Sequence, residues 1–388
     1  MNWLLLAWRN LGAKKLSTAL SLVLLAFGVG MVSVLMLAER QLTAAFERNI
    51  DDIDLVLGAK GSPMQLILAN VYHVDAPTGN IKLADAQRVM RHPYIASAIP
   101  LAYGDNHEGY RIIGTTPAYP KHYAAELAEG RAWAAPYEVV LGVDVAAATG
   151  LSLGDTFYSA HGLQDATDVH KDKAFTVVGI YAKSRTVVDQ LILCNMESVW
   201  GVHGLEDAPR EVTAVLLKKR NPLAVLTIPN VIRDTNMQVA LPAIEVNRLT
   251  QNFGLGMRTL RALAALIVAL SFASIFISVY DSLLARRYEL ALLRTMGASP
   301  AGVYGSLLLE GGLLSTGGAL LGLAVGRVGM AALATFVADK FHYDLGTLAV
   351  LPGELVLVGG AIGVGLLAAA IPGISVLRMD ISKTLSDG

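Results

Sequence analysis

The sequence predicts a membrane α-helical protein with four transmembrane helices, both termini in the cytoplasm, and an inserted α+β periplasmic domain. Two observations predict this class. The 388 residues are 54% hydrophobic and only 16% charged, whereas soluble domains carry roughly 25% charged residues. The apolar residues gather in stretches near the ~20 residues that cross a bilayer, and one long polar segment separates the first stretch from the second. A soluble enzyme is therefore disfavoured.

Four apolar stretches account for the membrane part. We place the transmembrane helices at residues 16–38, 258–281, 301–338 and 354–377. The apolar core of the first exceeds the roughly 7–15 residues of a cleaved signal peptide, so we expect it to be retained as an anchor. Residues 1–15 are expected to form a cytoplasmic interfacial helix, because tryptophans stand beside basic residues there.

Basic residues at the helix ends predict the orientation of the chain. They gather before the first span, after the second and after the fourth, and four spans place these three clusters on one side of the membrane. The positive-inside rule makes that side the cytoplasm. Residues 39–257 and the loop 339–353 are then periplasmic in a bacterial inner membrane, and the tail 378–388 is cytoplasmic.

The outer segment, residues 39–257, indicates an α+β domain with helical stalks. Strand patterns occur at Glu138–Gly142, Ala174–Tyr181 and Thr213–Lys219. Helix patterns occur at ADAQRVMRH and MESVWGV. The flanking stretches ERQLTAAFERNI and AIEVNRLTQNFGLGMRTLRALA continue the neighbouring spans outward without a proline, although two glycines weaken the second stretch as a helix.

Two charged residues lie within the third span, Glu310 and Arg327. They stand roughly 25 Å apart along a helix, which prevents them from pairing with each other. Arg327 reaches the outer interface, where its side chain can snorkel to water. Glu310 lies roughly 13 Å deep. We expect it to make hydrogen bonds or to contact a neighbouring helix rather than to relay protons, because no second acid lies at matching depth.

Glycines recur at four-residue intervals in the third and fourth spans. That spacing places small residues on one helix face, where the backbone of another helix or subunit can approach closely. Glycine is also frequent in membrane helices in general, and the sequence does not separate the two explanations. The candidate packing residues are Gly318, Gly322, Gly326, Gly359 and Gly363.

No catalytic residue is predicted. The chain has no G-x-x-x-x-G-K-[ST] phosphate loop and no G-x-S-x-G elbow, so we expect neither ATP hydrolysis nor another enzymatic activity. Cys194 lies in an apolar run that predicts a buried, inert thiol. His161 and His170 are weak candidates for a metal site, because their spacing matches no standard ligand pattern. The net charge of -1 leaves no basic surplus for nucleic acid.

The most informative segment is residues 282–300, between the second and third spans. A helix-forming run with both signs of charge breaks at Gly297 and restarts at Ser299, which can cap the following helix, with proline in its first turn. We predict a short amphipathic coupling helix at the cytoplasmic membrane surface. The alternative is a charged loop that serves only to set the topology.

This segment resembles the signature R-R-x-E-[IL]-A-[LV]-L-R-x-[ML]-G-A-S of FtsX-like permease subunits of ABC transporters, the class that includes the MacB and LolC/LolE permeases. The opening LAWRNLGAKKLSTALSLVLLAFGV and the ending AIPGISVLRMDISKTLSDG are similar to the two ends of that family, and EVVLGVDVAAATGLSLGDTF resembles its MacB-type periplasmic core domain. The residues that match the signature are Arg286, Arg287, Glu289, Leu290, Ala291, Leu293, Arg294, Met296, Gly297, Ala298 and Ser299.

The resemblance implies a permease subunit that forms a homodimer or heterodimer and binds a separate cytoplasmic ATPase subunit. That ATPase would hold ATP and Mg²⁺, and this chain would bind no cofactor directly. Hydrolysis would drive periplasmic movements that extract or export a lipid, lipoprotein, peptide or drug, which is mechanotransmission. A periplasmic adaptor or substrate-binding protein and membrane lipid are further implied partners. The ATPase-coupling residues would be Arg286, Arg287, Glu289, Leu293, Arg294, Met296, Gly297, Ala298 and Ser299.

Two other functions stay open at this point. Division-type members of the same family activate a periplasmic peptidoglycan hydrolase and transport nothing, although they generally have a smaller outer domain. A subunit of a zinc-linked envelope transport system is a third reading, motivated only by the histidines of the outer segment.

Overall fold

The structure is a computed structural model that describes residues 3–161, 168–169, 173–202, 209–341 and 351–377. The chain divides into two compact units. The helical unit consists of Met1–Leu42, Phe253–Lys340 and Leu345–Gly388. The sheet unit consists of Thr43–Asn252 and Phe341–Asp344.

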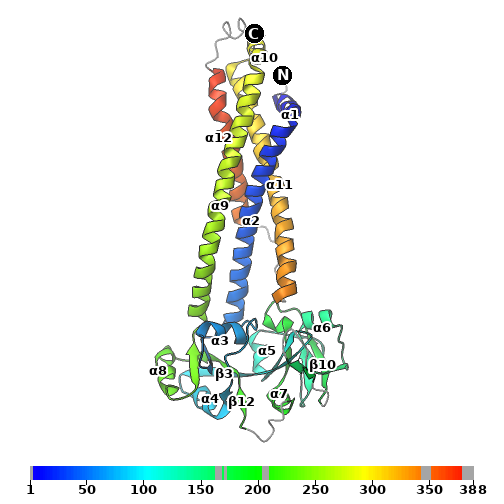
Figure 1. Ribbon diagram of the computed structural model, residues 1–388, viewed down its shortest axis with the longest axis vertical. Coiled ribbons are helices and arrows are strands. Elements are labelled where there is room, and N and C mark those ends of the chain that lie inside the picture. The colour runs from blue at the N-terminus through cyan, green and yellow to red at the C-terminus, as the bar shows by residue number, and fades with distance from the viewer. Residues whose placement is uncertain (1–2, 162–167, 170–172, 203–208, 342–350, 378–388) are drawn as a thin grey trace. The chain divides into compact units, whose positions relative to one another are not determined.

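The helical unit is built from long apolar helices that lie alongside one another (Figure 1). Four of the described helices are long and apolar enough to cross a membrane, namely α2, α9, α11 and α12. A short helix precedes α2, and another joins α9 to α11. The bounds are α1 Trp3–Ala13, α2 Lys15–Ile50, α9 Pro242–Ala285, α10 Arg287–Thr295, α11 Pro300–Phe341 and α12 Pro352–Leu377.

α2 and α9 extend well beyond a membrane-spanning length, as does α11 with its 42 residues. α2 has 36 residues and α9 has 44, against the ~20 that a bilayer needs. Their additional turns are the flanking stretches in which the sequence predicts helical stalks, and the glycines of α9 do not interrupt it. The last turns of α2 and the first turns of α9 belong to the sheet unit. Each of these helices therefore supplies residues to both units.

The core of the helical unit is apolar and draws on all four long helices and on α10. The residues that share it are Leu25, Val29, Ile275, Val279, Leu283, Leu290, Val303, Leu307, Leu314, Ala319, Ala361, Ala368, Ala369 and Val376. Because surrounding lipid is as apolar as these side chains, close packing rather than the hydrophobic effect must hold such helices together.

That close packing is visible where α2 meets α11. A Cβ atom added to Gly322 would lie 2.9 Å from the Ala26 carbonyl oxygen, and one added to Gly30 would lie 2.9 Å from the Gly322 carbonyl oxygen. At Gly326 the nearest atom would be a side-chain atom of Ser33, 3.0 Å away. The two backbones are in contact here, which only residues without a side chain allow.

The remaining candidate glycines have different surroundings. A Cβ added to Gly318 would lie 2.8 Å from the Leu25 side chain, so this residue also packs against α2. A Cβ added to Gly359 or to Gly363 would meet no atom within 4 Å. In the described structure these two glycines of α12 therefore do not serve packing inside the chain.

The sheet unit contains one large mixed sheet with strand order β14-β1-β13-β3-β4-β11-β6-β10-β5. Outside this order, β7 pairs with β10, and β8 pairs with β3 and with β9. Strands β2 and β12 form a separate pair. Only β4–β11 and β6–β10 are parallel among the described pairs. The bounds are β1 Leu55–Ala59, β2 Ile81–Lys82, β3 Ile95–His107, β4 Tyr110–Thr115, β5 Leu127–Gly130, β6 Glu138–Leu141, β7 Thr156–Phe157, β8 Ala160–His161, β9 Asp168–Val169, β10 Phe175–Tyr181, β11 Ile192–Asn195, β12 Glu211–Val212, β13 Ala214–Lys219 and β14 Met237–Ala240.

Short helices accompany the sheet. They are α3 Pro63–Asn70, α4 Leu83–Met90, α5 Ala118–His122, α6 Val143–Thr149, the 3₁₀ turn η1 Val187–Gln190, α7 Met196–Val202 and α8 Ala224–Val231. The three strand patterns and the two helix patterns that the sequence predicts in this region are confirmed as β6, β10, β13, α4 and α7.

The sheet separates two hydrophobic cores. In β1, Val56 packs into one cluster while its neighbours Leu55 and Leu57 pack into another. In β13, Leu216 joins the first cluster and Val215 joins the second. Successive side chains of a strand point to opposite faces, so both faces of the central strands are covered. This is why β1 is buried at every position.

Cys194 lies in β11 and is fully buried. Burial raises the pKa of its thiol to about 12. A thiol that stays protonated at neutral pH is neither a nucleophile nor a good metal ligand. The structure therefore agrees with the expected inert thiol.

A histidine of the sheet unit is held between two tyrosines. His73 Nδ1 lies 2.6 Å from the Tyr103 hydroxyl, and Nε2 lies 2.8 Å from the Tyr119 hydroxyl. Burial, with a smaller contribution from the charge of Arg111, lowers the pKa of His73 to about 3. The histidine pKa of the unfolded chain is 6.5. Between about pH 3 and pH 6.5, the unfolded chain therefore binds a proton at His73 that the folded chain does not bind.

We expect the sheet unit to lose stability as the pH falls below 6.5, because His73 must then be folded in its neutral form. The loss is about 1.4 kcal/mol per pH unit until the folded pKa is reached. Between pH 6.5 and 5, the wild type should lose about 2 kcal/mol more than His73→Gln. Denaturant unfolding of the full chain in nanodiscs measures this, with Trp3→Phe and Trp8→Phe leaving only the tryptophans of the sheet unit. Equal losses in both proteins would contradict the assignment.

Candidate functional site

The short helix α10 stands between the two longest helices of the chain. Arg286 leaves helical geometry with φ -116° and ψ 14°, which ends α9 and lets α10 start at Arg287. Gly297 takes φ +99°, a conformation that favours glycine, and ends the segment. The Ser299 side chain then accepts a hydrogen bond of 3.1 Å from the Gly302 backbone N–H and caps α11.

One face of α10 is anchored in the helical unit. Leu290 and Ala291 are buried, with 2% and 0% exposure. Leu293 and Ala298 are partly buried and pack against the same core. Leu290, Ala291 and Leu293 lie within one turn of α10, and Ala298 follows its end, so the middle of α10 and the residues just after it are held against the bundle.

The opposite face of α10 exposes an apolar stripe. Tyr288, Leu292 and Met296 are 51%, 46% and 77% exposed. Their spacing of four residues aligns them on one side of the helix. Arg287 and Glu289 are also exposed. An exposed apolar stripe with a charge at its edge is typical of a protein-docking surface, and we call Tyr288, Glu289, Leu292 and Met296 the α10 stripe.

The nine candidate coupling residues divide between these two faces. Arg287, Glu289, Met296, Gly297 and Ser299 are exposed, while Arg286, Leu293, Arg294 and Ala298 are partly buried. Tyr288 and Leu292, which are not among the predicted coupling residues, complete the exposed stripe. Their spacing of eight and four residues from Met296 is the signal that could have found them.

Arg286 contacts both the stripe, through Glu289, and the protein interior, through Glu310. Its side chain is 19% exposed. Its Nε lies 3.2 Å from Glu289 Oε2, and its Nη1 lies 3.5 Å from Glu310 Oε1. Arg286 therefore links the first turn of α10 to α11.

Glu310 is buried in the helical unit with 2% exposure. Its carboxylate accepts hydrogen bonds from the Asn10 amide of α1 and, at 3.4 Å, from the Ser282 hydroxyl of α9. Together with Arg286, the groups that contact Glu310 therefore come from α1, from the last turn of α9 and from the residue between α9 and α10. Structural hydrogen bonding, which the sequence analysis favoured for this residue, is what the described contacts show.

A second buried carboxylate joins its own helix to two others. Glu354 of α12 is 2% exposed. It accepts hydrogen bonds from Ser33 of α2 at 2.7 Å, from the Leu351 backbone N–H at 3.0 Å, and from Arg327 of α11 at 2.6 Å. The expectation that Arg327 snorkels to water therefore needs correction. A partner on another helix neutralises its charge, which spacing within one helix could not reveal.

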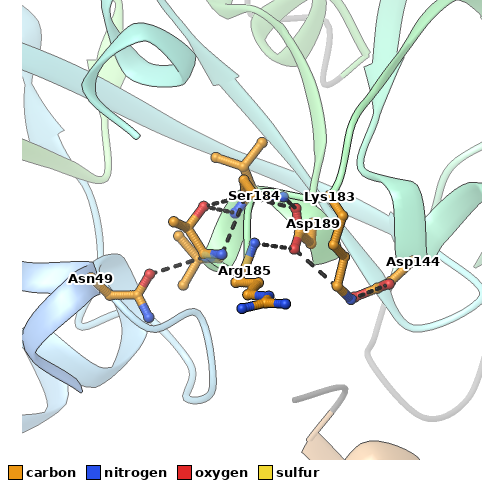
Figure 2. Close-up of polar contacts among 9 residues, drawn as sticks. Asn49, Asp144, Lys183, Ser184, Arg185 and Asp189 are labelled. Atoms are coloured by element: carbon orange, nitrogen blue, oxygen red, sulfur yellow. Dashed lines mark hydrogen bonds and ion pairs between the residues drawn. The ribbon is translucent and has the colours of Figure 1, made fainter. Parts of the chain in front are cut away.

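A polar cluster in the sheet unit organises the turn between β10 and β11, as Figure 2 shows. Asp189, 2% exposed, accepts hydrogen bonds from the Ser184 N–H and hydroxyl at 2.8 and 2.7 Å and from the Arg185 N–H at 2.7 Å. Lys183 lies 3.9 Å from Asp189 and 2.7 Å from Asp144. These bonds hold Arg185 in the left-handed region, with φ 58°.

The same turn is bonded to the end of α2. Asn49, fully buried in the last turn of that helix, accepts a 3.0 Å hydrogen bond from the Val187 N–H (Figure 2). The Tyr123 hydroxyl donates to the Asn49 carbonyl at 3.3 Å. Within the sheet unit, α2 therefore ends in buried, hydrogen-bonded surroundings and not in a free linker.

A metal site receives no support from the described residues, among which no group of three or more His, Cys, Asp or Glu could hold an ion. His161 ends β8, but its side chain is not described, and His170 lies outside the described residues. The metal interpretation stays a prediction from the sequence alone.

Comparisons with known proteins identify the class. Residues 18–222 match the family model of the MacB-like periplasmic core domain, and residues 261–381 match that of the FtsX-like permease C-terminal region. The chain belongs to the FtsX-like permeases with a MacB-like periplasmic core domain, which are ABC transporter permeases.

Particular relatives lie within this family. The chain is 25% identical over 256 residues to the lipoprotein-releasing system transmembrane protein LolC of Neisseria meningitidis, covering 60% of this chain and 59% of that protein. It is 24% identical over 348 residues to LolC of Xylella fastidiosa, covering 82% of this chain and 79% of that protein. The crystal structure of the periplasmic region of MacB from Actinobacillus actinomycetemcomitans matches 53% of this chain and 96% of that one, at 13% identity and a TM-score of 0.35.

Proposed function

We propose that this chain is the permease subunit that couples ATP hydrolysis by a separate ATPase subunit to movements of the sheet unit in the periplasm. The observation that carries the proposal is the α10 stripe, an exposed apolar surface on a helix whose other face is packed into the membrane helices. A partner that pushes on the stripe would move a helix that is anchored in the bundle through its opposite face. The chain's own sequence contains no phosphate loop with which to hydrolyse ATP.

The basic residues at the helix ends support the orientation in which the stripe lies in the cytoplasm. With both termini and α10 in the cytoplasm of a bacterium, the stripe faces an ATPase that binds ATP and Mg²⁺, and the sheet unit lies in the periplasm. α2 and α9 are continuous helices with residues in both units. They would carry displacement from the cytoplasmic side to the sheet unit, so that no substrate channel through the membrane is required.

A second copy or a related permease would complete the transporter. Gly359 and Gly363 of α12 have open space around them, and small residues on an open helix face suit close packing with another subunit. Relatives of this chain are named for a lipoprotein-releasing system. Among the lipids, lipoproteins, peptides and drugs considered, we therefore propose a lipid-modified protein as the substrate class.

Replacing Met296 with Asp should weaken binding of the ATPase, because an unpaired carboxylate would be buried in the apolar contact. Loss of one contact of about 2 kcal/mol weakens binding roughly thirtyfold. The measurement is the amount of ATPase that co-purifies with the full chain from solubilised membranes, together with its ATP hydrolysis. Glu289→Lys should also reduce the yield by reversing a charge at the edge of the stripe.

Leu226→Asp is the matched control, because Leu226 is an apolar residue of the sheet unit that is 69% exposed. It should leave ATPase binding at the wild-type level. Wild-type binding and coupling in both Met296→Asp and Glu289→Lys would overturn the proposed docking surface. A wild-type protein that captures a peptidoglycan hydrolase and shows no transport would instead support the division-type function.

A further inference from the structure

The joint between α9 and α10 poses a mechanical problem. α9 ends at Ala285, and Arg286 has non-helical dihedral angles before α10 begins. A residue at an element end that can change φ and ψ acts as a hinge. If this hinge moved freely, a push on α10 would bend the joint and would not reach α9.

The contacts around Glu310 restrain this hinge. Glu310 pairs with Arg286, and Arg286 pairs in turn with Glu289 of α10, so the chain of contacts crosses the joint. Glu310 also accepts from Ser282 in the last turn of α9 and from Asn10 of α1. One buried carboxylate of α11 therefore holds the end of α9, the start of α10, and α1.

We propose that Glu310 is a positioning residue that locks the α9–α10 joint and α1 to α11, so that displacement of α10 passes into the long helices. The role in transmission rests on the proposed function, whereas the locking itself is a property of this chain alone. A carboxylate suits this role because its two oxygens can accept from several donors at once. It is costly to bury without them, so the charged group and its donors hold one another in place.

The chain offers a matched control in Glu354. It has the same 2% exposure and also accepts from three donors, two on other helices and one just before its own helix. Its partners Ser33, Arg327 and Leu351 include none of the residues at the α9–α10 joint. Glu310→Gln and Glu354→Gln should therefore both lower the melting temperature, but only Glu310→Gln should loosen the joint.

The experiment measures, in the full chain in nanodiscs, how firmly α10 is held to α1, the two helices that the contacts of Glu310 connect to α11. Cys194→Ala removes the only cysteine, and spin labels are then attached through Leu4→Cys on α1 and Thr295→Cys on α10, both exposed residues. Pulsed electron paramagnetic resonance reports the distance distribution between them. Glu310→Gln should at least double its width, while Glu354→Gln keeps the wild-type width. Equal widths in both variants, or an unchanged width in Glu310→Gln, would overturn the proposal.

A second measurement tests transmission in the complex with the ATPase. A fluorescent dye attached through Leu226→Cys reports on the sheet unit when ATP and vanadate trap the ATPase. Glu310→Gln should bind the ATPase within twofold of wild type but lose more than half of the dye response, and Glu354→Gln should retain it. An undiminished response overturns the role in transmission. A wild-type chain that binds no ATPase refutes the proposed function, while the spin-label distances still decide whether Glu310 locks the joint.

Discussion

Replacing Arg327 with Met should destabilise the helical unit by about 3–5 kcal/mol, which is the usual cost of leaving one member of a buried ion pair without its partner. The side chains of Arg327 and Glu354 are 23% and 3% exposed. Glu354 would keep its bonds to Ser33 and the Leu351 N–H, but its charge would have no counterion. Thermal unfolding of the full chain in nanodiscs, followed through Trp3 and Trp8 after Trp133→Phe and Trp200→Phe, measures the loss.

The double variant Arg327→Met/Glu354→Gln separates the charge from the packing. An amide at position 354 can still accept from the Leu351 N–H and donate to the Ser33 hydroxyl, and no charge is left unpaired. We expect this protein to recover most of the stability that the single variant loses. A double variant as unstable as the single one would show that the arginine contributes through packing alone.

Replacing Gly322 with Leu should separate α2 from α11 and cost about 3 kcal/mol or more. The new Cβ would lie 2.7 Å from the Val29 Cβ and 2.9 Å from the Ala26 carbonyl oxygen. Removing glycine from a helix interior gains only up to about 1 kcal/mol. The steric conflict is therefore the larger effect. The same unfolding measurement applies, and cross-linking between cysteines placed on α2 and α11 should fall in parallel.

Gly363→Leu is the control for this prediction. Gly363 is likewise a glycine inside a long apolar helix, but an added Cβ would meet nothing within 4 Å. The stability of the isolated chain should stay within about 0.5 kcal/mol of wild type. Native mass spectrometry of the same variant tests whether α12 packs against a second copy. A loss of stability in Gly363→Leu equal to that in Gly322→Leu would refute the packing argument.

Much of the fold could be predicted because its signals are local. The apolar stretches of α2, α9, α11 and α12 exceed the length of a bilayer, and the period-two patterns of β6, β10 and β13 distinguish strands from helices. Residues 282–300 also follow from local signals, because the helix break at Gly297 and the cap at Ser299 depend only on neighbouring residues.

The buried polar contacts could not be predicted in the same way. The Arg327–Glu354 pair and the Glu310–Arg286 pair each join different helices, and no periodicity links such positions. The assignment of glycines shows the same limit. Gly322 and Gly363 share one spacing motif, yet only the first touches another helix of the chain.

The sequence by itself determined the class of the protein, its apolar helices and the position of the short helix between two of them, because hydrophobic length, periodicity and capping act within a few turns of chain. Only the tertiary structure decided which side of α10 is exposed and that Arg286 points inward to Glu310. Those outcomes depend on which helices pack together. Packing brings residues 300 positions apart, such as Asn10 and Glu310, into hydrogen-bonding contact.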